Sequence, residues 1–152
     1  MKPLPHILFG FAFAFFLYLV FPHVGLLESS IIFLSSFLID VDHYLYHLYK
    51  EKKLSLQKIL LILSDRHERV KALSKEEKRN YYMGVYFLHG IEILILILIL
   101  GYFISPLFFY LFVGFAFHLL LDTFHGVKLD IPLYKISIIR DFYKFKKLKR
   151  FR

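Results

Sequence analysis

Four apolar runs, each long enough to cross a membrane, limit what this chain can fold into. A hydrocarbon core of about 30 Å needs roughly 17 to 25 helical residues. The runs are 5–21, 26–49, 85–104 and 106–124. Of the 152 residues, 58% are hydrophobic and 20% aromatic, which exceeds the usual content of soluble domains. The sequence therefore predicts an all-α, polytopic membrane protein, a four-helix bundle that forms a single domain over 1–152.

The basic residues predict how this bundle is oriented. Of the 20 Lys and Arg residues, one is Lys2, ten lie in 50–79 and nine in 128–152. The other two connections carry none, and short loops rich in Lys and Arg stay in the cytoplasm. We expect a multi-pass protein of the cell inner membrane, with both termini, the loop 50–80 and the tail 126–152 in the cytoplasm. The basic segments suit anionic lipid headgroups as partners, and we expect no nucleic acid.

Two cytoplasmic segments are expected to lie at the membrane surface. In the loop, apolar residues recur at helical spacing ahead of a charged second half, which predicts an interfacial helix; they are Leu56, Ile59, Leu60 and Leu63. The basic tail interleaves aromatic residues and isoleucines with lysines, which is typical of a segment on the inner membrane surface.

Ionisable residues occur inside every predicted span, although an Asp at the centre of a membrane helix costs about 2.5–3.5 kcal/mol. They are His6 in the first span, Asp40, Asp42, His43 and His47 in the second, His89 and Glu92 in the third, and His118, Asp122 and His125 in the fourth. With the predicted orientation, they lie in the cytoplasmic halves of their spans and can converge on one layer.

Helical spacing divides these residues by face. Asp40, His43 and His47 share one face of the second span, as His118, Asp122 and His125 do in the fourth. Asp42 falls on the side opposite Asp40 in an ideal helix. Either Asp42 supports a ligand from behind, or the helix is irregular at "DVDH".

Histidines and carboxylates that converge without Lys or Arg favour a metal site over a salt-bridge network. The chain has no cysteine, so the ligands must be nitrogen and oxygen, which suit zinc first, then manganese or iron. One or two ions fit the number of candidates. The expected ligands are His6, Asp40, His43, His89, His118 and Asp122.

The remaining candidates have more than one reading. Asp42 or Glu92 would orient a ligand or act as a general base. His47 and His125 lie near the cytoplasmic rim, where an interfacial role competes with ligation. A lone intramembrane histidine such as His6 is as often a bundle residue as a ligand.

Four motifs resemble a small membrane-bound, metal-dependent hydrolase-like family of bacteria and archaea: "PHILFG", "LIDVDH", a histidine that opens the third span, and "GFAFHLLLD". The resemblance carries Asp40, Asp42 and His43 over from a Pro-Asp-x-Asp-His motif, with Ile39 in place of the proline. It carries His118 and Asp122 over from His-x-x-x-Asp. His89 matches the last histidine of a longer family motif whose first histidine has no counterpart here. The resemblance implies metal-dependent hydrolysis.

The leading hypothesis is a membrane-embedded metal-dependent hydrolase whose site opens to the cytoplasmic leaflet. A lipid phosphate ester or phosphodiester is the expected substrate, because headgroups lie at that depth and the rim is basic. One alternative is a small proton- or ion-coupled transporter, which predicts polar residues continuing through the outer half of the bundle. The other is a non-catalytic, metal-stabilised membrane scaffold.

Overall fold

The computed structural model describes residues 3–51, 61, 65, 68–80, 86–129 and 137–149. Within these residues the fold is all-α, without a strand. The helices are α1 (Pro3–Val20), α2 (Leu26–Leu38), α3 (Val41–Glu51), α5 (Lys75–Asn80), α6 (Ile91–Phe103), α7 (Leu107–Lys128) and α8 (Ile138–Lys149). The sequence prediction of an all-α fold is confirmed.

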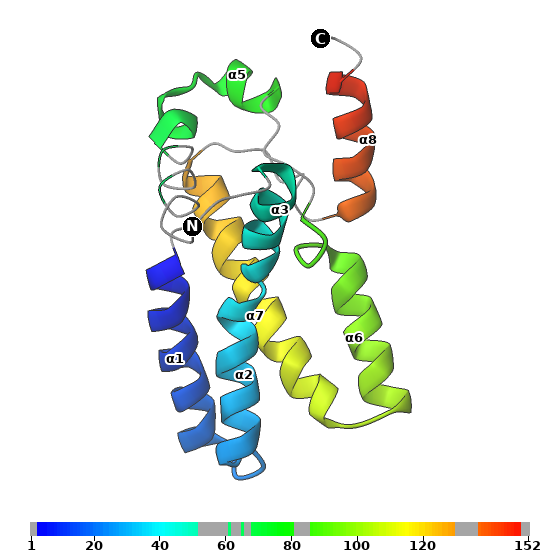
Figure 1. The fold of residues 1–152 in the computed structure, drawn as a ribbon. Helices are drawn as coiled ribbons and strands as arrows, with labels where there is room; N and C mark the ends of the chain where they lie inside the picture. The colour runs from blue at the N-terminus through cyan, green and yellow to red at the C-terminus, as the bar shows by residue number, and fades with distance from the viewer. Residues whose placement is uncertain are drawn as a thin grey trace.

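Helices α1, α2, α6 and α7 form the body of the molecule (Figure 1). Helices α1 and α2 make an antiparallel hairpin, and α7 packs against both. Helix α6 leads into α7 through a short turn at Ser105, so these two also run antiparallel. Helix α3 continues beyond the end of α2, α5 lies at the end of the molecule away from the hairpin turns, and α8 stands beyond the start of α6.

Small residues let α1, α2 and α7 approach one another closely. A methyl group added at Gly10 of α1 would overlap the Ser36 hydroxyl of α2, and one added at Gly114 of α7 would overlap Ser35 Oγ and the Ile32 carbonyl oxygen. Both serine hydroxyls bond within α2, Ser35 to Ile32 O at 3.0 Å and Ser36 to Phe33 O at 2.7 Å. Their polar atoms are therefore satisfied inside an apolar interface.

Only part of the predicted membrane topology can be read from the helices. Helix α7, with 22 residues, is long and apolar enough to cross a membrane. Two shorter apolar helices cover Leu4–Val20 and Ile91–Phe103. The predicted span 26–49 is two helices, α2 and α3, and the predicted span 85–104 has its helix only from Ile91 because Tyr86–Gly90 form a turn.

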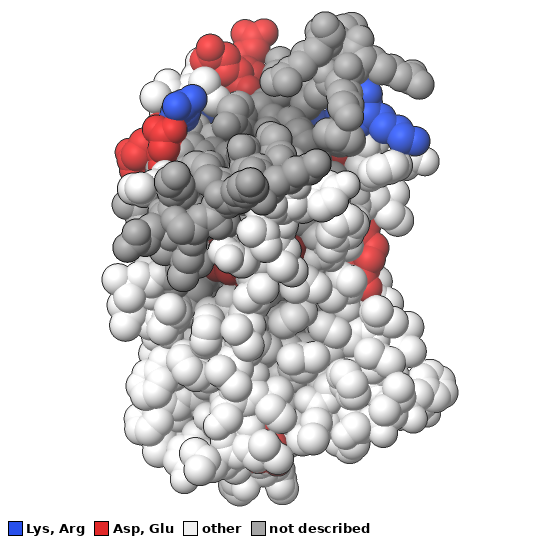
Figure 2. Space-filling model, in the orientation of Figure 1, with Lys and Arg blue, Asp and Glu red and all other residues white. Residues whose placement is uncertain are grey.

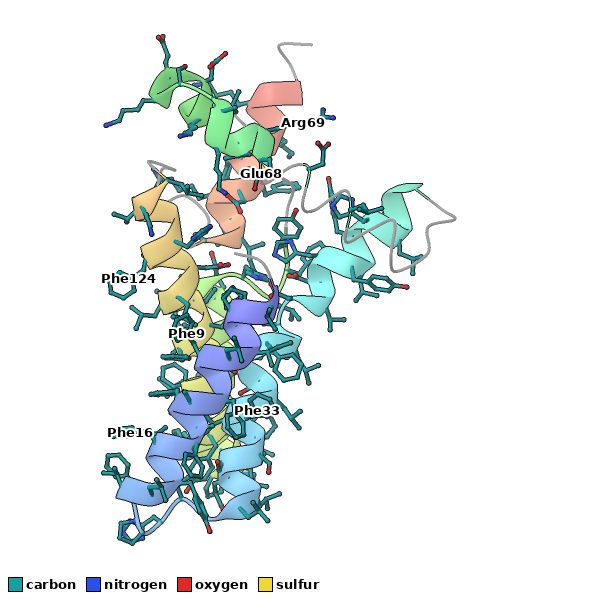
Figure 3. The ribbon with its side chains drawn as sticks, turned by 90° about the vertical axis from the view of Figure 1, so that its left-hand side faces the viewer. Phe9, Phe16, Phe33, Glu68, Arg69 and Phe124 are labelled. Carbon is teal, nitrogen blue, oxygen red and sulfur yellow. The ribbon has the colours of Figure 1, made fainter. Side chains whose placement is uncertain are left out.

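Much of the surface of the body is apolar. On the face in Figure 2, Lys and Arg of the described residues gather at the end that carries α5 and α8, and the opposite part is almost entirely uncharged. Figure 3 shows Phe16 of α1 and Phe124 of α7 projecting outward, and their exposed fractions are 55% and 66%. Exposed apolar area on this scale marks an interaction surface, either for another protein or for a membrane.

The loop and the tail are described in part. Helix α5 begins with a capping box in which the Ser74 amide donates to Glu77 Oε2 at 2.8 Å and the Glu77 amide donates to Ser74 Oγ at 3.3 Å. The expected interfacial helix around Leu56, Ile59, Leu60 and Leu63 lies outside the described residues. Helix α8 forms most of the described tail and does not lie across the end of the bundle: it points away from it (Figure 1).

Candidate metal centre

The helix break between α2 and α3 creates the site. At the break, the amide of Asp40 donates to Phe37 O at 3.1 Å and the amide of His43 donates to Asp40 O at 3.1 Å, a three-residue spacing instead of the α-helical four. The carbonyl of Ser36, which would have accepted from Asp40 in a continuous helix, is left for another donor. Ile39 at the break is fully buried, so this irregular backbone lies inside the protein.

His118 of α7 takes the carbonyl that the break releases. Its Nδ1 lies 2.8 Å from Ser36 O, and its ring is fully buried. A carbonyl oxygen can only accept, so Nδ1 carries the hydrogen. In the neutral imidazole, Nε2 is then an unprotonated lone pair that points away from α2.

Asp42 bonds to Nδ1 of His89, as the Ser36 carbonyl does to Nδ1 of His118. Its Oδ2 lies 3.0 Å from His89 Nδ1 and accepts the Leu88 amide at 2.9 Å, which fastens the Tyr86–Gly90 turn to α3. The carboxylate therefore makes Nδ1 of His89 the donor, and in the neutral imidazole Nε2 is then the lone pair. Both readings of Asp42 apply, because the helix is irregular at "DVDH" and Asp42 supports His89 from behind.

The two Nε2 atoms face each other at 3.3 Å between two carboxylates. Asp40 Oδ1 lies 3.5 Å from Nε2 of His89 and 3.6 Å from Nε2 of His118. Asp122 Oδ2 lies 3.6 Å from Nε2 of His118 and 3.9 Å from Nε2 of His89. Four electron-rich atoms from α2–α3, the Tyr86–Gly90 turn and α7 thus converge on one small volume.

His6 and His43 extend the cluster at opposite ends. Nε2 of His6 lies 3.2 Å from Asp122 Oδ1, and the His6 ring stacks on His118 with centroids 4.1 Å apart. Nε2 of His43 lies 3.5 Å from Asp40 Oδ1. Two groups of three side chains could each hold a metal ion, with their ligand atoms within 4.8 Å of one another: His6, His118 and Asp122, and Asp40, His43 and His89.

The cluster is most open around Asp40, Asp122 and His43. The side chains of His6 and His118 are 0% exposed and that of His89 is 4% exposed, whereas His43 is 15%, Asp122 17% and Asp40 21% exposed. Three of the four imidazoles are thus enclosed by protein. Access from outside therefore comes past the two carboxylates and His43.

Glu92 takes no part in the cluster. Its Oε1 accepts the Ser137 hydroxyl at 2.6 Å and the Ile139 amide at 3.4 Å, and its Oε2 accepts the Ile138 amide at 3.1 Å. These contacts make Glu92 the cap of α8. The structure gives the sequence-based reading of Glu92 as a general base no geometric support.

The other histidines lie outside the two groups. His47 is buried beside Tyr46, with ring centroids 5.4 Å apart, and His125 lies in the last turn of α7. His23 is exposed in the turn between α1 and α2. His67 is outside the described residues.

Sequence reasoning missed two neighbours of the cluster. The Ser36 carbonyl is available to His118 only because the helix breaks at Asp40, and no single residue type predicts the position of such a break. Tyr86 packs on His43 with ring centroids 3.7 Å apart and is 4% exposed. The sequence could have indicated Tyr86, because it lies three residues before His89 and a single turn can bring two such rings close together; their centroids are 5.9 Å apart.

The sequence matches no protein-family model, and no curated protein or solved structure is significantly similar to it. The site geometry therefore has to carry the functional argument.

Proposed function

We propose that this chain is a four-span membrane bundle that binds one or two divalent metal ions, zinc first among them, and hydrolyses a lipid phosphate ester or phosphodiester from the cytoplasmic leaflet. The observation that carries the proposal is the pair of imidazole Nε2 atoms, 3.3 Å apart, set between two carboxylates. The proposed membership of the membrane-bound, metal-dependent hydrolase-like family rests on the same residues.

The surface of α6 supports the membrane placement. Beyond Glu92 this helix is apolar on every side, yet Ile95, Leu96 and Ile99 are 53%, 49% and 47% exposed. A helix that is hydrophobic all round is buried either in protein or in lipid. Because the chain leaves these side chains uncovered, lipid is the phase that covers them.

The broken helix fits this environment too. Non-helical backbone at membrane depth is tolerated where it is buried in protein or lines a cavity, because its polar groups need partners there. The break at Ile39 and Asp40 meets that condition, since Ile39 is buried and the released Ser36 carbonyl binds His118. Broken helices in membranes commonly form ion-binding sites.

The tautomers support a cation at the centre of the cluster. Both Nδ1 atoms are committed as donors, so two neutral imidazoles would turn lone pairs towards each other and towards two carboxylates. Such an arrangement is repulsive unless a positive charge lies among these atoms. A divalent metal ion is the charge that His and Asp ligands bind best; a proton between the two nitrogen atoms is the alternative.

The distribution of polar side chains favours hydrolysis over transport. In the described outer parts of α1 and α2, Ser29 Oγ bonds to Ala14 O at 3.1 Å and Ser30 Oγ to Leu26 O at 2.7 Å. Both hydroxyls are thus satisfied by backbone and offer no relay. A one-sided site that opens past Asp40 and Asp122 suits a substrate that approaches from one leaflet.

A metal bound here would lower the pKa of a bound water to about 7 and polarise the ester under attack. His118 and His89 would present Nε2, held in that tautomer by Ser36 and Asp42. The partly exposed Asp40 and Asp122 would balance the charge and face the substrate. The basic segments predicted on the cytoplasmic side would attract its phosphate.

Metal analysis of the purified protein, paired with melting temperatures with and without chelator, tests the metal. We expect bound zinc or manganese in stoichiometric amount, and a stabilisation of about 2.7 kcal/mol when the free ion exceeds its dissociation constant a hundredfold. Hydrolysis of phosphatidic acid and of phosphodiester lipids, restored by metal after stripping, tests the reaction. A protein that binds metal but hydrolyses neither lipid would favour the non-catalytic scaffold. A protein that binds no metal would favour a proton between the two Nε2 atoms.

A further inference from the structure

Glu92 lies between two helix N-termini that face each other. Helix α6 runs from Ile91 away from the site, and α8 runs from Ile138 in the opposite direction, so the two helices start at one joint (Figure 1). The Glu92 carboxylate is in the first turn of α6 and accepts the Ser137 hydroxyl and the first two amides of α8. One negative charge thereby compensates the positive ends of two helix dipoles that would otherwise repel.

The joint is tight as well as charged. A methyl group added at Gly90 would overlap the Ile138 side chain, so the start of α8 sits directly on the backbone next to His89. The far end of α8 points away from the bundle (Figure 1). The first turn of α8 is therefore joined to the segment that carries a site histidine.

Together, α6 and α8 are long enough to cross the hydrocarbon core of a membrane. The 13 residues of α6 are about 20 Å long, short of a hydrocarbon core of about 30 Å. The 12 residues of α8 extend the same side of the molecule by about 18 Å. The first part of α8 then falls at the depth of the inner leaflet and the remainder at the headgroups.

The outward face of α8 has the chemistry for that depth. Ile139, Phe142 and Tyr143 are 60%, 46% and 69% exposed. Exposed basic residues flank them, and Lys146 Nζ lies 4.7 Å from the Phe142 ring centroid. Apolar side chains with cations beside them suit an anionic lipid surface, because the rings enter the acyl boundary and the ammonium groups reach the headgroups.

We propose that α8 is the inner-leaflet continuation of α6, joined to it at Glu92, with its outward face against anionic lipid. The proposal rests on the membrane placement argued above. It assigns Glu92 a positioning role: the carboxylate holds a lipid-contacting helix against the turn that carries His89.

Single tryptophan variants test the lipid contact, because the sequence contains no tryptophan. Phe142→Trp, Phe16→Trp and Glu76→Trp are reconstituted in vesicles of phosphatidylcholine, alone or with phosphatidylglycerol, that contain acyl-brominated lipid. We expect quenching of Phe16→Trp in both lipids, quenching of Phe142→Trp that increases with phosphatidylglycerol, and none for Glu76→Trp in α5.

The three variants separate the two proposals. If Phe16→Trp stays bright, the membrane placement fails and the proposed function with it. If Phe16→Trp is quenched but Phe142→Trp stays as bright as Glu76→Trp, only the assignment of α8 fails.

Hydrogen exchange of the reconstituted full chain tests the joint. Glu92→Gln keeps the size of the side chain but removes the charge that both helix ends share, so we expect the amides of α8 to exchange at least tenfold faster than in the wild type. Glu28→Gln, a first-turn glutamate of α2, is the matched control and should leave α8 unchanged. Unchanged exchange of α8 in Glu92→Gln would overturn the role of Glu92.

Discussion

The hydrogen-bond partners of Nδ1 in His89 and His118 determine how strongly Nε2 of each ring can donate electrons to a ligand. In His89, Nδ1 bonds to a carboxylate and in His118 to a backbone carbonyl, at 3.0 and 2.8 Å. The difference matters, because a carboxylate makes the imidazole a stronger electron donor at Nε2 than a neutral carbonyl does. Asp42 thus acts on the centre through His89, while Asp122 faces the centre directly.

Substitution of these two aspartates separates the roles. Asp42→Asn should weaken zinc affinity by about 10–100-fold, the usual effect of losing a partner behind a ligand. Asp122→Asn should weaken it further, because it removes a charge that lies near three histidines, His6, His89 and His118. Zinc titration of both purified variants against a competing chelator measures the two losses. Equal losses would mean that Asp42 also binds the ion.

Helix α2 positions more parts of the site than any other helix described. It supplies the Ser36 carbonyl to the site and packs its two buried serines against glycines of α1 and α7. Gly114 lies one turn before His118 on α7, so the closeness of α7 to α2 at Gly114 sets the distance from His118 to Ser36. Packing in the apolar part of the bundle thereby determines the geometry of the polar part.

Gly114→Ala tests this dependence. The added methyl meets Ser35 Oγ and the backbone carbonyl of Ile32, and the backbone cannot turn aside, so we expect a loss of about 1–3 kcal/mol in stability together with weaker zinc binding. Gly101→Ala is the matched control, because the three atoms nearest to its methyl all belong to the Phe109 ring, the closest at 3.0 Å, near the end of α6 away from the site. Thermal unfolding and zinc titration check both variants. Full zinc affinity in Gly114→Ala would contradict the coupling.

Sequence periodicity predicted the all-α fold and the convergence of the ionisable residues, because helical spacing alone puts His118 and Asp122 on one face. It offered a helix irregularity at "DVDH" as one of two readings and could not decide between them. The residues 26–49 are apolar or helix-compatible throughout, and the carbonyl that the break releases at Ser36 is bonded by His118, 82 residues later in the chain. The role of Asp42 depends on this break, so the sequence alone left two interpretations of Asp42.

Glu92 shows a second limit of reasoning from the sequence. An acid inside an apolar helix, three residues after His89, looks like a member of the site. Its partners are Ser137 and Ile138, 45 and 46 residues later in the chain. A contact of that sequence separation depends on how the tail folds back, which spacing within one helix does not reveal.

For the whole molecule, the separation of charge along its length predicts its orientation. The absence of cysteine allows a clean test by single-cysteine labelling. Ser105→Cys, in the turn between α6 and α7, should react with an impermeant thiol reagent in intact cells. Glu76→Cys, in α5, should react only after the cells are opened. The reverse pattern would overturn the cytoplasmic placement of the loop and would put the site at the outer leaflet.

The close contacts of Gly10 and Gly114 with α2 also bear on how the protein matures. These contacts between α1, α2 and α7 involve no ion, whereas the Tyr86–Gly90 turn and Asp40 meet α7 through charged and polar groups. If the chain is the membrane metalloprotein proposed above, the bundle would assemble in the bilayer without metal and receive it afterwards, past the partly exposed carboxylates. Insertion and loading would then be separate events, and the supply of metal in the cytoplasm would set when the finished bundle becomes active.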